Sequence, residues 1–253
     1  MILAVSIDNA HITIGLIDGE DIVSEQLASR EMTGFELAMH IHSVLGLYGY
    51  GADGIEGTII SSVVPALTGA ADSAAVKLTG RAPIIVGPGV KTGLHIVIDD
   101  PAELGADLVT QAVGAVGEYP LPLVIVDMDT AASISVIDSK RRYVGGMLLP
   151  GMRISMDALR RCTSSLPHVP LGSAPRKVIC SNTEDCLRAG AFYGFACAID
   201  GVIDRIAEEL GEAPTIVLTG NDAGLISDTL RHDAVLDPVL SLKGLKIIYD
   251  KNQ

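Results

Sequence analysis

Serine and histidine side chains, which often act as nucleophiles or metal ligands, occur here at spacings that build no site. Ser61 and Ser62 end an apolar run. No Gly-x-Ser-x-Gly turn surrounds them, so we interpret their hydroxyls as caps of the following helix. His11 follows an expected hairpin turn, and His40 and His42 lie on an expected helix at positions that face different sides. These histidines are interpreted as surface or hydrogen-bonded residues and not as a metal centre.

The cysteines also lack the spacing of a metal site. Cys162, Cys180, Cys186 and Cys197 include no Cys-x-x-Cys pair, and the spacing of Cys180 and Cys186, six positions apart, does not match a zinc motif. We expect reduced, structural thiols, as in a cytoplasmic protein.

Composition excludes several classes of partner. The 253 residues carry a net charge of −13, no Trp and 4% aromatic residues. Nucleic-acid binding needs Lys and Arg on phosphates and aromatic rings on bases, so it is not expected. No apolar run reaches the roughly 18 residues of a membrane helix, and the N-terminus lacks the basic segment of a signal peptide. The sequence predicts a cytoplasmic protein that acts on small molecules.

Strands and helices alternate along the chain, which is typical of an α/β fold. The expected strands are residues 2–7, 11–17, 21–28, 58–64, 83–86 and 215–218. The expected helices are residues 36–47, 66–79, one that begins near Pro101 and a long one near 182–210.

An internal repeat divides the chain. Val5-Ser6-Ile7-Asp8 and the strand that returns to Asp18 are matched by Val126-Asp127-Met128-Asp129 and the strand that returns to Asp138, at an offset of about 120 residues. Each copy is a strand, a turn that carries an Asp, a returning strand and a second polar turn. We therefore predict two like domains, residues 1–118 and 119–253, with a linker at 119–122 and a small-molecule site between them.

Several motifs along the whole chain resemble those of the type III pantothenate kinases. They are Ser61-Ser62-Val63-Val64-Pro65, the Gly-rich loop Gly87 to Leu94, Asp100 to Asp107, Gly145 to Gly151, Asn182-Thr183 and the C-terminal run Gly244 to Asn252. This resemblance implies two actin-like (ribonuclease H-like) domains, the fold of the acetate and sugar kinases. It also implies ATP-dependent phosphorylation of pantothenate, the first step of coenzyme A biosynthesis, with Mg²⁺ and a monovalent cation.

In this family, hairpins of the forms D-x-G-N-T and D-x-G-T bind the ATP phosphates and Mg²⁺. The Asp holds the metal, the Gly lets the backbone approach phosphate oxygens, and the Thr donates a hydrogen bond. The resemblance assigns nucleotide binding to Asp8, Asn9, Asp127, Asp129, Thr130, Thr219 and Gly220, with Asp127 as the metal ligand.

This chain departs from both hairpin motifs. The first reads Ser6-Ile7-Asp8-Asn9-Ala10, so the family's Asp, Gly and Thr are replaced by Ser, Asp and Ala. The second reads Asp127-Met128-Asp129-Thr130, where the Gly is again Asp. The turn Thr219-Gly220-Asn221-Asp222 adds a further carboxylate where the family has T-G-G. A carboxylate about 4 Å from a phosphate charge costs roughly 4 kcal/mol at an effective dielectric of 20, so these replacements are expected to repel ATP.

The substrate side keeps some family residues and loses others. By resemblance, Asp107 is the general base, Gly105, Lys91, Thr92 and Gly93 contact pantothenate, and Thr163 reaches substrate across a dimer interface. Asp107 is also open to a purely structural interpretation, because the helix dipole favours an Asp in the first turn of a helix. His95, Ile98 and Leu108 replace the family's Asp, Tyr and Arg, so no cationic fork remains for the pantothenate carboxylate.

Three functions remain open from the sequence. The first is a catalytically impaired homologue that acts as a partner or regulatory subunit, in a homodimer or in a heterodimer with an intact paralogue. The second is an active pantothenate kinase in which Asp8 replaces Ser6 as a metal ligand. The third is a kinase for a different, more apolar acceptor. Small residues at 189–191, 194 and 196–198 predict that the long helix forms the dimer contact.

Overall fold

The computed structural model describes residues 1–253, which divide into two compact units. The first unit contains Met1–Glu118 and Val239–Gln253, and the second contains Tyr119–Pro238. The elements of the first unit are β1 Ile2–Ile7, β2 His11–Asp18, β3 Asp21–Ala28, α1 Gly34–Leu47, η1 Ala52–Gly54, β4 Gly57–Ser62, α2 Pro65–Thr79, β5 Ile84–Ile85, β6 His95–Ile96, η2 Pro101–Glu103, α3 Ala106–Glu118 and α8 Leu240–Lys251.

The second unit repeats the strand arrangement of the first. Its elements are β7 Leu123–Met128, β8 Ala131–Ile137, β9 Arg142–Pro150, α4 Met152–Cys162, α5 Thr183–Ala189, the π-helical turn η3 Gly190–Gly194, α6 Phe195–Leu210, β10 Thr215–Thr219, α7 Ala223–Ile226, η4 Ser227–Thr229 and β11 Ala234–Leu236. The strand order β3-β2-β1-β4-β5 of the first sheet recurs as β9-β8-β7-β10-β11 in the second. The internal repeat read from the sequence therefore corresponds to two copies of one sheet topology.

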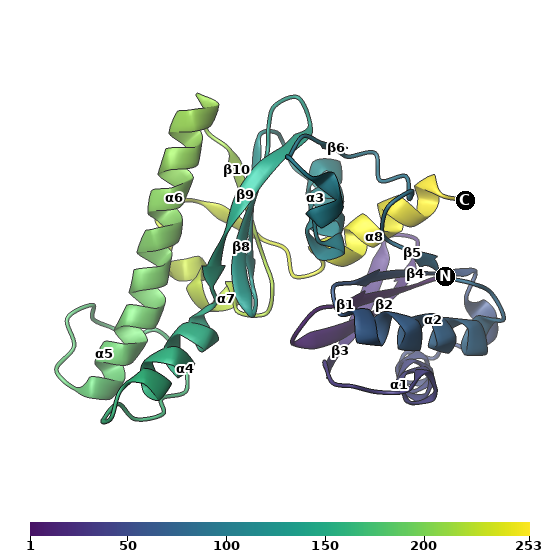
Figure 1. Ribbon diagram of the computed structural model, residues 1–253, viewed down its shortest axis with the longest axis horizontal. Helices are drawn as coiled ribbons and strands as arrows, with labels where there is room; N and C mark the ends of the chain where they lie inside the picture. Colours follow the sequence, from purple (N-terminus) through teal and green to yellow (C-terminus); the bar gives the residue numbers. More distant parts are fainter. The chain divides into compact units, whose positions relative to one another are not determined.

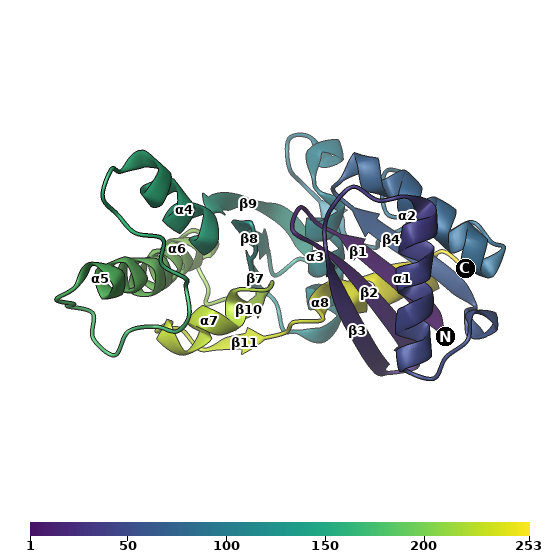
Figure 2. The ribbon, with the colours of Figure 1, turned by 90° about the horizontal axis from the view of Figure 1, so that it is seen from below.

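Helices cover both faces of the first sheet. On one face, α1 and α2 bury Leu37, Ile41 and Leu67 against β1 and β2, and α1 begins with a capping box between Thr33 and Glu36. On the other face, α3 and α8 pack over Ile2, Ala4 and Ile59. Figures 1 and 2 show this sandwich, with α8 alongside α3.

The C-terminal helix differs from the expected domain division. The sequence-based division assigned residues 119–253 to one domain, but α8 packs with α3 of the first unit. Two glycines make the close crossing possible. A Cβ on Gly244 would collide with the Thr110 carbonyl oxygen, and one on Gly114 would lie 2.5 Å from the Leu240 carbonyl oxygen. No apolar periodicity in the sequence reveals such a backbone contact.

A continuous helical stretch, Thr183–Leu210, spans α5, η3 and α6 (Figure 1). By length and composition alone it could cross a membrane, whereas no uninterrupted apolar run of that length is expected from the sequence. In the structure, 33% of its most apolar window is buried. Its inner side packs Phe192, Ile199 and Ile203 against the second sheet. Buried Asp200 accepts hydrogen bonds from the backbone amide of Arg231, which fixes the helix to its own unit.

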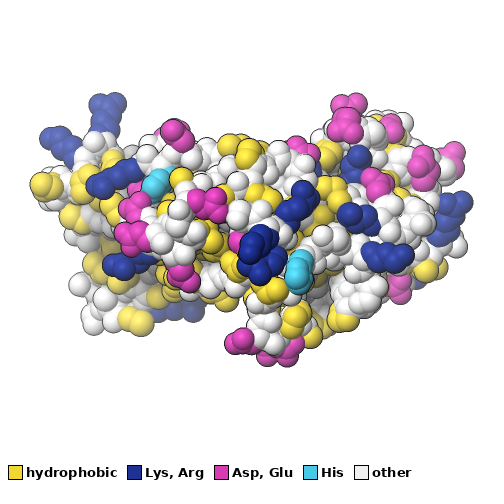
Figure 3. All heavy atoms as spheres, turned by 90° about the horizontal axis from the view of Figure 1, so that it is seen from above, with side chains coloured by type: hydrophobic (Ala, Val, Ile, Leu, Met, Phe, Trp, Pro, Cys, Tyr) yellow, Lys and Arg dark blue, Asp and Glu magenta, His cyan; other side chains and the backbone are white.

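The surface mixes charge and apolar side chains. On the face drawn in Figure 3, acidic and basic side chains are interspersed, and apolar side chains appear between them. Among the large apolar residues, Ile179 is 90% exposed, Leu47 75% and Leu148 71%. These residues lie on different elements, so exposure is not confined to one patch.

Candidate functional site

The first hairpin turn is closed by its own aspartate. Asp8 follows β1, and its Oδ1 accepts the backbone N–H of Ala10 at 2.8 Å and of His11 at 2.7 Å. The Asp8 amide donates to the His11 carbonyl at 3.0 Å. Asn9 lies exposed at the tip. Two amides that could face an anion therefore already have an anionic partner within the chain.

Below this turn, two serines lie side by side on parallel strands. Ser6 of β1 is in register with Ser61 of β4, and both are buried. Ser61 Oγ has no hydrogen-bond partner, so it does not cap the following helix as the sequence suggested. Ser62 fills part of that role, since its hydroxyl accepts the Val64 amide at 3.2 Å. The end of β1 thus presents a hydroxyl, and no carboxylate, beneath the turn.

Asp107 lies in the first turn of α3. Its Oδ1 accepts the Leu108 amide at 2.9 Å, and a Cβ on neighbouring Gly105 would collide with this carboxylate. Burial raises the pKa of the Asp107 carboxyl above its ordinary value, and the charge of Asp8 adds to the rise, while backbone hydrogen bonds oppose it. The negative charge of Asp8 is therefore close enough to affect the ionisation of Asp107. A carboxyl with a raised pKa accepts a proton more readily, as a general base requires.

The Gly-rich loop is held by the last residues of the chain. Asn252 pairs with Lys91 in both directions: its Oδ1 accepts the Lys91 amide at 3.0 Å, and its Nδ2 donates to the Lys91 carbonyl at 3.0 Å. Thr92 Oγ1 accepts the Leu94 amide at 3.2 Å. Val90 and Leu94 join the apolar cluster that also contains Leu104 and Ala106, next to Asp107. Among the expected substrate residues, Lys91 and Gly93 are exposed and Thr92 is half-buried.

The second hairpin carries the other predicted nucleotide residues. Asp127 is buried at the end of β7, while Thr130 is exposed in the turn. Asp129 Oδ1 accepts the side-chain amide of Asn221 at 2.8 Å. A Cβ on Gly151 would collide with the Asp129 carbonyl, so the start of α4 lies directly against this turn.

Thr219 ends β10 and Gly220 follows it, next to the same hairpin. Thr219 is buried, and Gly220 has a φ of 89°, which favours glycine. A Cβ there would also collide with the Asp127 carboxylate. The Asp222 amide donates to the Met128 carbonyl at 2.9 Å. The structure therefore brings together Asp127, Asp129, Thr130, Thr219 and Gly220 within the second unit.

Asp222 is neutralised, which corrects the expectation that it adds charge against phosphate. Arg153 of α4 forms two hydrogen bonds from Nε to the Asp222 carboxylate, at 3.1 and 3.0 Å, and one from Nη2 at 2.7 Å. The Asp222 side chain is 3% exposed and that of Arg153 is 67% exposed. Nothing in the sequence pattern linked these residues, which lie 69 positions apart.

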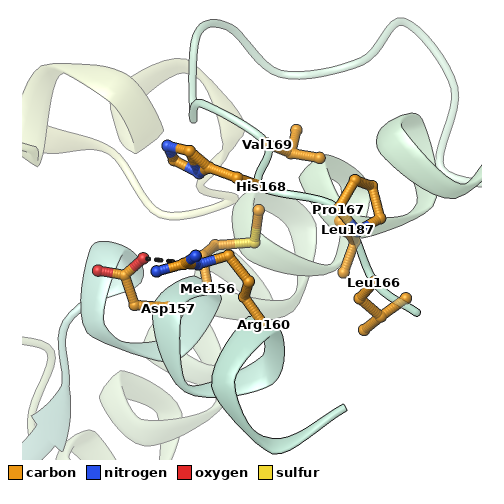
Figure 4. Close-up of a pocket in the computed structure, with 8 residues that line it drawn as sticks. All are labelled: Met156, Asp157, Arg160, Leu166, Pro167, His168, Val169 and Leu187. Atoms are coloured by element: carbon orange, nitrogen blue, oxygen red, sulfur yellow. Dashed lines mark ion pairs between the residues drawn. The ribbon is translucent and has the colours of Figure 1, made fainter. Parts of the chain in front are cut away.

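Thr163 is not near the second hairpin. It follows the last residue of α4, whose other end contacts Asp129, and an 11-residue helix spans roughly 16 Å. Its hydroxyl donates to the Leu159 carbonyl at 2.7 Å. The pocket close by is lined by Met156, Asp157, Arg160, Leu166, Pro167, His168, Val169 and Leu187 (Figure 4). Its volume of about 10 Å³ holds at most one water, so it is no ligand site.

Comparison with solved structures identifies the fold. The activator of the 2-hydroxyisocaproyl-CoA dehydratase from Clostridium difficile, solved with bound ADPNP, aligns with a TM-score of 0.55 at 13% identity over 98% of this chain and 92% of that one. Component A of the (R)-2-hydroxyglutaryl-CoA dehydratase from Acidaminococcus fermentans aligns with a TM-score of 0.55 at 14% identity over 98% and 96%. The predicted actin-like ATPase and sugar kinase fold is confirmed.

Comparison of sequences identifies the family. The type III pantothenate kinase family model matches residues 2–205. Type III pantothenate kinases from an Exiguobacterium species and from Syntrophotalea carbinolica are each 38% identical over 255 aligned residues, covering 100% of this chain and of each relative. The enzyme from Geobacter sulfurreducens is 36% identical with the same coverage. The chain therefore belongs to the type III pantothenate kinase family.

Proposed function

We propose that this chain is a type III pantothenate kinase homologue whose nucleotide site is blocked by its own carboxylates. As isolated, it phosphorylates pantothenate negligibly and acts in the cytoplasm as a partner or regulatory subunit. This proposal rests mainly on the hydrogen bonds that the Asp8 carboxylate accepts from the two backbone amides of the first hairpin turn.

At this turn a phosphate would lose two hydrogen-bond donors and would meet an added negative charge. A phosphate oxygen that approached this turn would have to displace Asp8 Oδ1 from the Ala10 and His11 amides. The displaced carboxylate would remain nearby, and about 4 Å between like charges costs roughly 4 kcal/mol at an effective dielectric of 20. In the second unit, Asp129 likewise stands where the family has glycine. Arg153 offsets the charge of Asp222, so Asp222 adds little to the repulsion.

The metal-binding residues fit Mg²⁺ only in part. Asp127 is a buried carboxylate at the end of a strand, and carboxylate oxygen is the donor that Mg²⁺ prefers. Ser6, at the matching position of the first hairpin, offers a hydroxyl. Asp127 would hold the ion, which when bound would neutralise phosphate charge, while the first hairpin would not contribute its usual carboxylate.

The partner role rests on an exposed strip of the long helix. Gly190, Gly194, Cys197, Ala198 and Gly201 are all exposed, at spacings that place them on one side of α5–α6. Small residues allow a second helix to approach closely. We propose that this strip forms a homodimer, or a heterodimer with an intact paralogue to which the chain would lend Thr163.

An active kinase with rearranged metal ligands is the second candidate. Asp8 uses Oδ1 for the turn, which leaves Oδ2 for a metal ion, and its charge contributes to the raised pKa of Asp107. In this scheme Asp8 would replace Ser6 as ligand, Asp107 would accept the proton of the substrate hydroxyl, and a monovalent cation would assist ATP.

A pantothenate phosphorylation assay with Mg-ATP separates the two candidates. The unmodified chain should give no turnover above background. Ser6→Asp, Asp8→Gly, Ala10→Thr and Asp129→Gly together should restore nucleotide binding, and Leu108→Arg added to them should restore turnover. Asp18→Gly, at the turn between β2 and β3, is the matched control and should restore neither. Robust turnover by the unmodified chain would favour the Asp8 metal scheme.

The partner proposal has its own test. Light scattering at micromolar concentration should give the mass of a dimer, and a short thiol crosslinker should join Cys197 residues of two chains. Replacing Gly194 with a bulky Leu should abolish both. A monomer under these conditions would exclude the homodimer and leave the heterodimer, which co-purification with an intact family member tests directly.

A further inference from the structure

We propose that Cys180 and Cys186 are a thiol–disulfide pair, a modification site at the start of the long helix that reacts with small disulfide oxidants such as glutathione disulfide. The Cys186 sulfur lies 3.5 Å from the backbone carbonyl oxygen of Cys180, to which its thiol donates. The Cys180 thiol donates to the Lys177 carbonyl at 3.1 Å. The Cys186 sulfur therefore lies directly beside the backbone of Cys180.

Both thiols are accessible, contrary to the expectation of structural cysteines. Cys186 is exposed and Cys180 is half-buried. A buried structural cysteine is inert, whereas two accessible cysteines this close in the chain can be oxidised. Cys162 and Cys197 are also exposed, but they lie on other helices, α4 and α6. Cys162 is the control for an accessible thiol without this pairing, because Cys197 lies in the strip proposed for the dimer contact.

The order of steps follows from the surroundings of Cys180. Burial, with the charge of Asp185 and the neighbouring Cys186, raises the pKa of the Cys180 thiol, which makes it a poor attacking group at neutral pH. We therefore assign the first step to Cys186. Its thiolate attacks one sulfur of glutathione disulfide, forms a mixed disulfide and releases one glutathione thiolate.

The second step closes the bond within the chain. Cys180 loses its proton and attacks the Cys186 sulfur, which releases the second glutathione thiolate. Two protons leave the protein and two glutathione thiols form, so the protein loses two hydrogen atoms in total.

The closed loop encloses the N-terminal cap of α5. Asn182 caps this helix by accepting the Asp185 amide at 2.9 Å, and it also donates to the Asp185 carboxylate at 2.7 Å. A bond from Cys180 to Cys186 would fasten this cap to the preceding segment, which includes the exposed Val178 and Ile179. Oxidation would thus restrict the segment that leads into the long helix.

Mass spectrometry of the full chain after incubation with glutathione disulfide tests this proposal. We expect a loss of about 2 Da and one peptide that links Cys180 to Cys186. Cys180→Ser should instead accumulate the glutathione adduct on Cys186, whereas Cys162→Ser and Cys197→Ser should behave like the parent chain. A stable adduct in the parent chain, a link to Cys162 or Cys197, or no reaction would overturn the proposal.

Alkylation of the native chain gives a measurement that needs no variant. After oxidation, Cys180 and Cys186 should both lose reactivity toward iodoacetamide, and Cys162 should keep its reactivity. Continued alkylation of Cys186 would contradict the assignment.

Discussion

Replacing Asp8 should change stability and anion binding in opposite directions. The Asp8 carboxylate accepts two backbone amides of a half-buried turn, at 2.8 and 2.7 Å. Losing a side-chain acceptor of this kind at a helix N-cap costs about 1 kcal/mol, up to about 2. We therefore expect Asp8→Ala to lower the free energy of unfolding by about 1–2 kcal/mol. Asp8→Asn keeps an oxygen acceptor and should lose less than about 0.5 kcal/mol.

The same variants should bind phosphate oxygens more tightly. Removing a charge about 4 Å from a phosphate relieves up to roughly 4 kcal/mol, and even a third of that is about tenfold in affinity. Urea unfolding and calorimetric titration of inorganic pyrophosphate measure the two effects on one sample. Asp18→Ala, which removes an exposed carboxylate from the other end of β2, is the control and should change neither. Unchanged stability in Asp8→Ala, or unchanged pyrophosphate affinity in both Asp8 variants, would refute the reasoning.

Three further sets of substitutions test the packing and the charges. Gly244→Ala should destabilise the chain by about 1–3 kcal/mol, because the added Cβ would collide with backbone atoms of α3. Gly69→Ala, which places its Cβ in open space on α2, should stabilise the chain by up to about 1 kcal/mol. The midpoints of urea unfolding compare the two variants. Arg153→Ala should cost about 1–3 kcal/mol by leaving buried Asp222 unpaired, and adding Asp222→Asn should recover part of this loss in thermal unfolding. Asp107→Asn should stabilise the chain at neutral pH, because the raised pKa of Asp107 in the folded state makes its ionised form unfavourable there. The gain in the free energy of unfolding should shrink as the pH falls through the folded-state pKa toward the unfolded-state pKa. The same gain at every pH would contradict this prediction.

Local patterns predicted most elements of the fold. The expected strands at 2–7, 11–17 and 21–28 correspond to β1, β2 and β3, because alternating apolar residues and the Asp18-Gly19 turn act within a few residues. The repeat predicted the second sheet for the same reason. The return of α8 to the first unit was missed because it depends on Gly114 and Gly244 meeting across 130 residues of sequence.

The resemblance named the candidate site residues, but the sequence did not indicate their contacts. The sequence indicated that Asp8 and Asp222 add carboxylates, and it gave no sign of their partners. Asp8 turns back to its own hairpin amides, and Asp222 pairs with Arg153. Both contacts depend on side-chain direction, which the order of residues does not contain. The signal that could have suggested the first is an Asp two residues before an amide in a tight turn, a common local hydrogen bond.

Calorimetric titration of Mg-ATP into the unmodified chain, beside the Exiguobacterium relative, tests the central claim most directly. We predict that this chain binds Mg-ATP at least about 100-fold more weakly than the relative, the scale expected when a preorganised electrostatic contact is lost. Equal affinities would show that the carboxylates at Asp8 and Asp129 do not block the nucleotide, and would contradict the account.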